Sequence, residues 1–355
     1  MSEIPHRLFY LCYYSGDPTG GIKKVYEHVD ILNQTGYPAY VVHNDLGYRY
    51  AWYQYAARIP VAYMESVDEP FITLDAAGNK EVLAPLSQND ILVIPEPWAY
   101  KIAPYLEHRN FSGVIFNQNA HYTFRELHHP LHPFLGERDT HRIIPYLSKN
   151  NLGTLVVSQE NQEYLEYTFP HKDFHLVRLS CDERLFYFNS QKKKQIAYMP
   201  RKCRADALQV IEILRLRNKL DRWLFYPIEN QTEEEVARIL RESAIFMSFS
   251  HREGFGLPPL EAMACGCIVI GYHGQAGKEF LKEPYAYPIT EGEIVQFAQK
   301  VEEIALQWDK DPTKYEKQGN LAADYIRTHY SNILEKEDLI NAWKKILIKQ
   351  RQYSK

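Results

Sequence analysis

The sequence has few cysteines, no long apolar run and no excess of basic residues, and each absence excludes a class of protein. The five cysteines, Cys12, Cys181, Cys203, Cys265 and Cys267, are odd in number and lack Cys-x-x-Cys spacing, which argues against a disulfide framework or a zinc knuckle. No apolar stretch approaches the roughly 18 residues that a membrane-crossing helix needs. Lys and Arg total 41 against 45 Asp and Glu, a formal charge of -4, so no basic field attracts nucleic acid.

The beginning of the chain also lacks the marks of a signal peptide. Its first residues, MSEIPHRLFYLCYY, contain an acid and a proline where a signal peptide would carry positive charge. We therefore expect a cytoplasmic protein with reduced thiols. The chain has 355 residues, of which 45% are hydrophobic and 24% charged, so it is long enough for two folded domains with separate cores.

Short β-branched runs alternate with helical stretches, as in parallel sheets covered by helices. Strands are expected at residues 8–14 and at AYVVHN, DILVIPE, GVIFNQ and TLVVSQ, and a helix over residues 22–35. A second series, QIAYMP, RWLFYPI, AIFMSFS and CIVIGY, follows the charged segment NSQKKKQ, which we expect to be poorly structured. Within it, Thr232 followed by Glu235 predicts a capped helix start.

The alternation predicts an α/β fold of two Rossmann-like, doubly wound domains. We place the first domain at residues 1–175, the second at 176–330 and a C-terminal helix at 331–355. The apolar face of that helix, including Leu339, Trp343, Ile346 and Ile348, must be buried, and we expect it to cross back to the first domain.

The most informative string is FSHREGFGLPPLEAMACGCIVIGYHG. In it, Glu253 and Glu261 lie on either side of a glycine-bearing loop that enters a helix through Pro258, a residue suited to a first helical turn. Gly254 and Gly256 let the backbone approach a ligand closely, and the free N–H groups of a helix start favour phosphate or sugar oxygens. Glu261, one turn into the helix, can accept hydrogen bonds from a ribose diol.

From Glu253 onward, this string resembles the motif of two glutamates separated by seven residues in retaining glycosyltransferases of the GT-B fold, in particular family 4. The resemblance includes GFGLPPLEAMACG and CIVIGY and extends more weakly over most of the chain. It implies a nucleotide diphosphate sugar as donor, with Glu253 at the hydroxyls of the transferred sugar and Glu261 at the ribose. It also implies that the sugar or phosphates face backbone groups of the loop, at Gly254, Phe255, Gly256 and Leu257.

A glycine pair follows the first strand of the chain. Gly20 and Gly21 match the turn through which the family's first domain touches the donor diphosphate, and the following helix would aim its N-terminus there. The alternative is a plain tight turn, because short glycine motifs have little specificity.

The segment AYMPRKCRAD lies where the family has an arginine and, about five residues on, a lysine that clamp the diphosphate. Arg201 fits the first role, but the expected lysine position holds Asp206. Either Lys202 or Arg204 would then complete the clamp, where fixed cations stabilise the charge of a departing diphosphate. The alternative interpretation is a solvated basic loop.

The acceptor side is expected in the first domain. His121 follows the strand GVIFNQ, at the edge where open α/β sheets bind ligands, and it is similar in position to a histidine that the family places near the donor sugar. A structural histidine is the alternative. We expect no metal at His128, His129 and His132, because no carboxylate or cysteine pattern completes a site. The donor base should lie near Ile228.

The predicted function is retaining transfer of a sugar to a growing glycan or glycolipid, by analogy in polysaccharide biosynthesis, with no cofactor and no metal. A non-catalytic nucleotide-sugar or glycan-binding protein remains open, since intact binding residues do not prove turnover. A sugar-nucleotide epimerase on the same fold is disfavoured by the two-glutamate string. The basic residues after 341 favour, as a lower-ranked interpretation, weak attraction to an anionic membrane surface.

Overall fold

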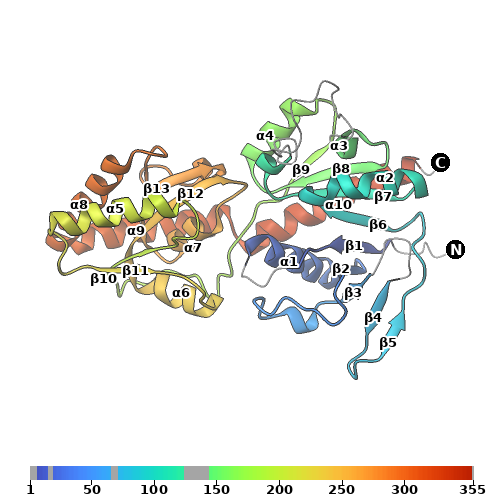
Figure 1. Ribbon diagram of the computed structural model, residues 1–355, viewed down its shortest axis with the longest axis horizontal. Helices are drawn as coiled ribbons and strands as arrows, with labels where there is room; N and C mark the ends of the chain where they lie inside the picture. The colour runs from blue at the N-terminus through green and yellow to red at the C-terminus, as the bar shows by residue number, and fades with distance from the viewer. Residues whose placement is uncertain (1–5, 15–18, 65–70, 124–143, 354–355) are drawn as a thin grey trace. The chain divides into compact units, whose positions relative to one another are not determined.

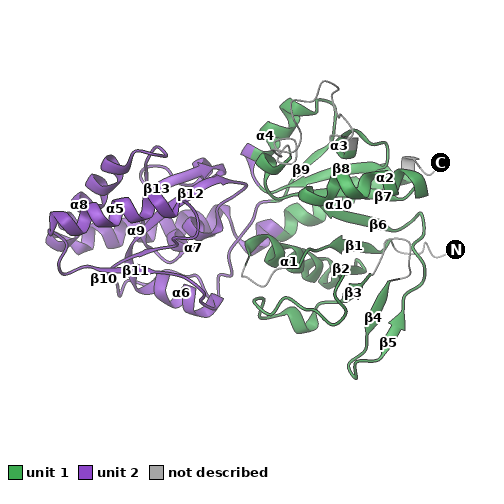
Figure 2. Cartoon of the chain, viewed as in Figure 1, with its two compact units in different colours: residues 1–157, 161–177, 336–355 green, residues 158–160, 178–335 purple. Residues whose placement is uncertain are grey.

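The computed structural model describes residues 6–14, 19–64, 71–123 and 144–353. The chain divides into two compact units, coloured separately in Figure 2. The first comprises residues 1–157, 161–177 and 336–355, and the second comprises residues 158–160 and 178–335.

Among the described residues, a nine-stranded sheet forms the first unit, in the order β5-β4-β3-β2-β1-β6-β7-β8-β9 (Figure 1). Its neighbours pair in parallel except at β3–β4 and β4–β5, which are antiparallel. Every residue of β1 and β6 is buried, as expected of central strands covered on both faces. The strands are β1 Leu8–Leu11, β2 Ala39–His43, β3 Val61–Tyr63, β4 Ile72–Leu74, β5 Lys80–Val82, β6 Ile91–Pro95, β7 Ser112–Asn117, β8 Asn151–Val156 and β9 Phe174–Leu176.

Helices of this unit present apolar faces to the sheet. In α1, buried residues recur at the helical spacing of Ile22, Val25, Val29 and Leu32. The helices are α1 Gly20–Gln34, α2 Ala99–Arg109, α3 Ile144–Leu147, α4 Gln159–Thr168 and the greater part of α10 Asn332–Tyr353, with short 3-10 turns at Ala56–Arg58, Glu96–Trp98 and Ala120–Tyr122.

The first strand is shorter than the sequence predicts. It ends at Leu11 rather than at residue 14, because its last pairing with β2 is Leu11 opposite Val42 and its last pairing with β6 is Tyr10 opposite Val93. Tyr13 and Tyr14 therefore lie beyond the carboxyl end of the sheet.

The last helix, α10, packs into the core of the first unit from residue 336 onward. Trp343 is fully buried, and its indole Nε1 donates a hydrogen bond to the Tyr10 hydroxyl at 3.0 Å. Leu339 and Ile346 are buried on the same face. Ile348 was expected there as well, but its side chain is 58% exposed, because two residues after Ile346 the helix has turned to its other side.

Replacing Trp343 by phenylalanine is expected to lower the free energy of unfolding by about 1–3 kcal/mol, since the variant loses buried ring volume and deprives the Tyr10 hydroxyl of its donor. Urea denaturation measures the change. Ile348→Ala on the exposed side of the helix is the matched control and should stay within about 0.5 kcal/mol of the wild type. Equal effects of the two substitutions would contradict a structural role for the indole.

The second unit is built on a parallel sheet in the order β11-β10-β12-β13-β14. Its core gathers apolar residues of the strands and of α5, α8 and α9. The strands are β10 Lys193–Tyr198, β11 Leu224–Pro227, β12 Ser243–Glu253, β13 Ile268–Gln275 and β14 Tyr287–Pro288, and the helices are α5 Arg204–Arg217, α6 Glu233–Glu242, α7 Leu257–Ala264, α8 Ile294–Lys310 and α9 Pro312–His329.

Local sequence signals of this unit are confirmed. The Thr232 hydroxyl accepts a hydrogen bond from the Glu235 N–H at 3.3 Å and caps α6. Cys265 and Cys267 are fully buried core residues. Within the described residues, no helix has both the length and the apolar character needed to cross a bilayer.

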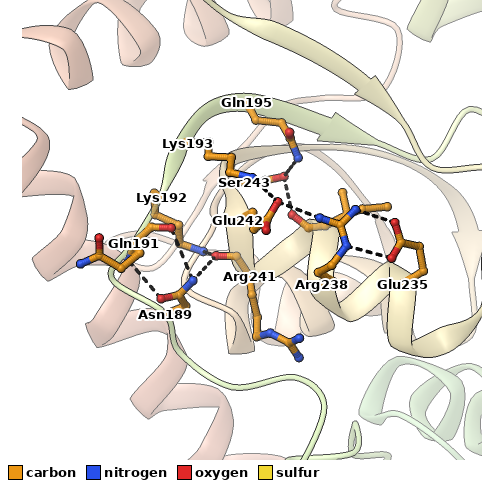
Figure 3. Close-up of polar contacts among 11 residues, drawn as sticks. Asn189, Gln191, Lys192, Lys193, Gln195, Glu235, Arg238, Arg241, Glu242 and Ser243 are labelled. Carbon is orange, nitrogen blue, oxygen red and sulfur yellow. Dashed lines mark hydrogen bonds and ion pairs between the residues drawn. The ribbon is translucent and has the colours of Figure 1, made fainter.

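The segment NSQKKKQ is better ordered than the sequence suggests (Figure 3). Lys192 Nζ donates to the carbonyl oxygens of Arg241, at 3.0 Å, and Cys265, at 2.7 Å. The Asn189 amide also donates to the Arg241 carbonyl. These side chains satisfy carbonyl groups that the last turns of α6 and α7 leave without intrahelical partners. Residues 189–192 form no helix or strand, as expected, but their side chains are held by these contacts, and residues 193–195 belong to β10.

Candidate functional site

In the second unit, the chain continues from β10 to β11 on one side of the sheet and from β12 to β13 on the other side. The strand order therefore changes direction between β10 and β12. Open α/β sheets bind ligands at the carboxyl ends of such strands. The loop after β10 carries Arg201 and Lys202, Arg204 opens α5, and the loop after β12 carries Gly254 and Gly256. The two segments singled out in the sequence thus meet at one edge of this sheet.

An ion pair joins these two loops. Lys202 Nζ contacts Glu253 Oε1 across a separation of 51 residues in the chain, and both side chains are half-buried. Arg204 instead pairs with Glu229 at 3.3 Å in an exposed position, and Arg201 is exposed. Of the two cations that could complete the clamp, Lys202 is the one in contact with the first motif glutamate.

The position where the family has a lysine is occupied by Asp206 for a local reason. Asp206 lies in the first turn of α5, where a negative charge is favourable to the helix dipole. Its carboxylate accepts a hydrogen bond from the Tyr272 hydroxyl at 2.9 Å. The acid therefore stabilises the helix start and its contact with β13.

The glycine-bearing loop has the backbone geometry of a close turn into α7. Gly256 has φ +96°, a left-handed conformation that favours glycine. Phe255 is buried against Phe280 and Tyr330, so only its backbone can face a ligand. Leu257 opens α7, with Pro258 in its first turn as predicted. Glu261, in the next turn, is 9% exposed.

Two further residues shape this edge. A Cβ at Gly274 would lie 2.8 Å from Ser250 Cβ and 3.0 Å from Glu253 Cγ, so a glycine here gives Glu253 its room. The sequence signal was the last glycine of FSHREGFGLPPLEAMACGCIVIGYHG, to which the sequence analysis gave no role. Ile228 is buried, and its N–H donates to the Tyr198 carbonyl at 2.8 Å, so its side chain offers little surface to a nucleotide base.

In the first unit, the strand order changes direction at β1 and β6, and Gly20 and Gly21 open α1 beyond β1. A Cβ at Gly21 would lie 2.8 Å from Gln118 Oε1 and 3.4 Å from the Tyr13 hydroxyl. The nearest of these atoms is the end of the flexible Gln118 side chain, which can shift, so packing within the unit does not by itself require a glycine at 21. Gly20 is exposed.

His121 lies just past the carboxyl end of β7. Its backbone N–H donates to Asn119 Oδ1 at 3.1 Å, and its ring packs edge-to-face against Tyr164, with centroids 5.5 Å apart. His128, His129 and His132 lie outside the described residues.

Glu96 is a candidate that the sequence analysis missed. It follows β6 directly, its side chain is 9% exposed, and Oε2 accepts a hydrogen bond from the Gln118 N–H at 3.1 Å. Burial raises the pKa of Glu96 to about 7, although the backbone hydrogen bonds that its carboxylate accepts lower the pKa. Perturbed carboxyls at the ligand-binding edge of a sheet are candidates for functional groups. The available signal was the acid that ends DILVIPE.

The raised pKa of Glu96 predicts a pH effect on stability. The folded state keeps this proton up to about pH 7, whereas the unfolded chain loses it near 4.5, so the contribution of Glu96 to the free energy of unfolding falls as pH rises through that window. Between about pH 5 and about pH 8, wild type should therefore lose about 2–3 kcal/mol relative to Glu96→Gln.

Urea denaturation of both proteins at the two pH values measures this difference. Burial lowers the pKa of His28 to about 3 and of His43 to about 4, and these groups act in the opposite direction but equally in both proteins. If the difference in the free energy of unfolding between wild type and Glu96→Gln does not change with pH, the pKa of Glu96 is not raised in the folded state.

The chain is similar in sequence to known glycosyltransferases. Residues 219–321 match the family Glycosyl transferases group 1, and this range contains Glu253 and Glu261. An Alpha-1,6-glucosyltransferase of Actinobacillus pleuropneumoniae serotype 7 (strain AP76) is 28% identical over 304 residues, which cover 82% of this chain and 81% of that protein.

Two solved structures share the fold. A variant of S. aureus TarM in complex with fondaparinux, alpha-GlcNAc-glycerol and UDP superposes with a TM-score of 0.66 at 11% identity, covering 96% of this chain and 99% of that one. Anabaena HepE in complex with UDP gives 0.63 at 14% identity, covering 95% and 99%. The GT-B fold predicted from the sequence is confirmed.

Proposed function

We propose that the chain transfers a sugar from a nucleotide diphosphate sugar to a hydroxyl group of a glycan or glycolipid, with retention of configuration. The observation that carries this proposal is the Lys202–Glu253 pair at the switch-point edge of the second unit, beside the start of α7. A cation and a carboxylate there suit the two halves of the donor, its diphosphate and its sugar hydroxyls.

The donor's parts are assigned to different groups. Arg201 and Lys202, with Arg204 as an outer cation, bind the diphosphate, and Glu253 binds the hydroxyls of the transferred sugar. Glu261 binds the ribose. The N–H groups at the start of α7 add positive potential, and these fixed charges remove the need for a divalent metal.

Retention follows if the acceptor oxygen attacks the anomeric carbon from the face that the diphosphate leaves. The new C–O bond forms as the bond to the diphosphate breaks, and a phosphate oxygen takes the acceptor proton. Arg201 and Lys202 stabilise the charge that grows on the diphosphate. Glu96 and His121, at the ligand-binding edge of the first unit, bind and orient the acceptor hydroxyls.

UDP is the first nucleotide to test, because the TarM and HepE complexes contain it. A thermal-shift comparison of UDP, GDP, ADP and dTDP should show one that raises the apparent melting temperature, since a ligand of the folded state stabilises by mass action. Incubation with sugar donors of that nucleotide should then release free nucleoside diphosphate slowly by hydrolysis.

The same experiment separates the alternatives. Binding without hydrolysis of any donor, and without transfer to glycan acceptors, would favour a nucleotide-sugar binding protein. Conversion of the donor to a stereoisomer without release of the diphosphate would favour an epimerase.

The basic end of α10 supports a minor addition to the proposal, weak binding to an anionic membrane surface on the cytoplasmic side. Lys344 and Lys345 are exposed, whereas Lys349 pairs with Asp173 at 2.5 Å. Co-sedimentation with phosphatidylserine vesicles at low salt should be weakened by Lys344→Ala with Lys345→Ala. Equal sedimentation of both proteins would remove this addition.

A further inference from the structure

Three side chains with metal-binding atoms converge beside the Lys202–Glu253 pair. Cys203 precedes α5, His251 lies near the end of β12, and Glu291 lies between β14 and α8. Their ligand atoms all lie within 4.8 Å of one another, and His251 Nδ1 contacts Glu291 Oε1 directly. The three segments are far apart in the sequence, so no motif predicts the cluster.

The atoms in this cluster suit one class of metal. A thiolate, an imidazole and a carboxylate are ligands of Zn²⁺, whereas Mg²⁺ and Ca²⁺ take oxygen ligands. Ligand atoms around a tetrahedral zinc are roughly 3.5 Å apart. His251 and Glu291 are exposed, so packing does not fix the positions of their side chains.

Cys203 occupies a position that its local structure does not favour. Its backbone is left-handed, with φ +46°, and its side chain makes no capping hydrogen bond to α5. Glycine or asparagine would suit such a conformation better, and serine, threonine or aspartate would suit a helix cap better. The thiol packs partly against the core of the unit, with the metal-binding atoms of His251 and Glu291 close by.

The surrounding charge favours a cation. The carboxylates of Glu291, Asp206 and Glu253 all act on the thiol, against one ammonium group, that of Lys202. Lys202 and Glu253 neutralise each other, as do Arg204 and Glu229, so the excess negative charge near the thiol is that of Glu291 and Asp206.

We propose that Cys203, His251 and Glu291 bind one Zn²⁺, with water as the fourth ligand. The thiol releases its proton when the Zn–S bond forms. The ion would join the loop after β10, the end of β12 and the segment between β14 and α8, beside the proposed donor site. The site is a structural clamp, and its test does not depend on finding the sugar substrate.

The test uses the full chain, freed of metal with EDTA and then dialysed. Titration with Co²⁺ is expected to produce one equivalent of a complex with a thiolate-to-cobalt charge-transfer band and tetrahedral d–d bands, and Zn²⁺ should displace the cobalt. Zinc should also raise the apparent melting temperature.

Three variants test the ligands: Cys203→Ser, His251→Ala and Glu291→Gln. Each should weaken zinc binding by at least the roughly 10–100-fold that loss of an outer-shell partner typically causes, and Cys203→Ser should also abolish the charge-transfer band. His329→Ala, on the exposed side of α9, is the matched histidine control and should bind as wild type does. Circular dichroism of the metal-free variants checks that they are folded.

Absence of cobalt and zinc binding by the folded wild type would overturn the proposal. So would binding that persists unchanged in Cys203→Ser, or a cobalt complex without the charge-transfer band, because each would show that the thiol is not a ligand.

Discussion

Replacing Glu253 by alanine is expected to lower kcat by about 100–1,000-fold while changing the affinity for the free nucleoside diphosphate little. The proposed contact of this carboxylate is with the hydroxyls of the transferred sugar, and such contacts tighten as charge develops at the anomeric carbon. The loss should appear equally in kcat and kcat/KM, as expected for an interaction made mainly in the transition state.

Glu261→Ala provides the contrast. Its carboxylate is proposed to bind the ribose, a contact present in the ground and transition states alike, so KM and the nucleotide Kd should rise more than kcat falls. Glu234→Ala, on an exposed part of α6, controls for loss of an acid elsewhere in the same unit. Wild-type activity in Glu253→Ala, measured with the true donor, would show that the site is assigned wrongly.

Much of the fold could be predicted because its signals are local. Central strands such as β6 and β12 are buried on both faces and read as continuous apolar runs, and α6 begins at a cap that four consecutive residues define. The length of β1 was overestimated because Tyr13 and Tyr14 are apolar enough to extend the run, whereas the end of a strand depends on where its neighbours stop.

The order of NSQKKKQ was missed for a related reason. Lys192 looks like a solvated charge in the sequence, but three carbonyl oxygens, from α6 and from the end of α7, surround its ammonium group in the structure. Those acceptors lie 48 to 73 residues away in the chain. A pattern read over a short window has no access to such contacts.

The residues of the candidate site were likewise predictable only where they are close together in the sequence. Glu253, Gly256 and Glu261 belong to one continuous string, so the sequence could identify them together. The pairing of Lys202 with Glu253 and the room that Gly274 gives to Glu253 depend on the register of β10, β12 and β13. Glu96 was missed because a single acid after a strand has no specific spacing, and only its burial distinguishes it from a solvated acid.

Arg201→Ala is expected to lower kcat roughly a hundredfold, the loss that removal of one electrostatic contact of about 3 kcal/mol with the departing diphosphate produces. Lys202→Ala should have a comparable effect, because Lys202 lies against Glu253 and is proposed to share the diphosphate with Arg201. Arg204 pairs with Glu229 in an exposed position, so Arg204→Ala should have a smaller effect and serves as the matched control.

These cations predict that chelation leaves the wild-type enzyme active. Two fixed positive side chains and the N–H groups of the α7 start offset the charge of a departing diphosphate, which is the work of a divalent metal in other transferases. EDTA would also remove zinc from the proposed Cys203 site, so activity should be measured with the chelator present throughout and then with magnesium or manganese added. Complete loss of activity that either metal restores would contradict the assignment of Arg201 and Lys202, because the diphosphate would then depend on an ion rather than on the protein's own charges.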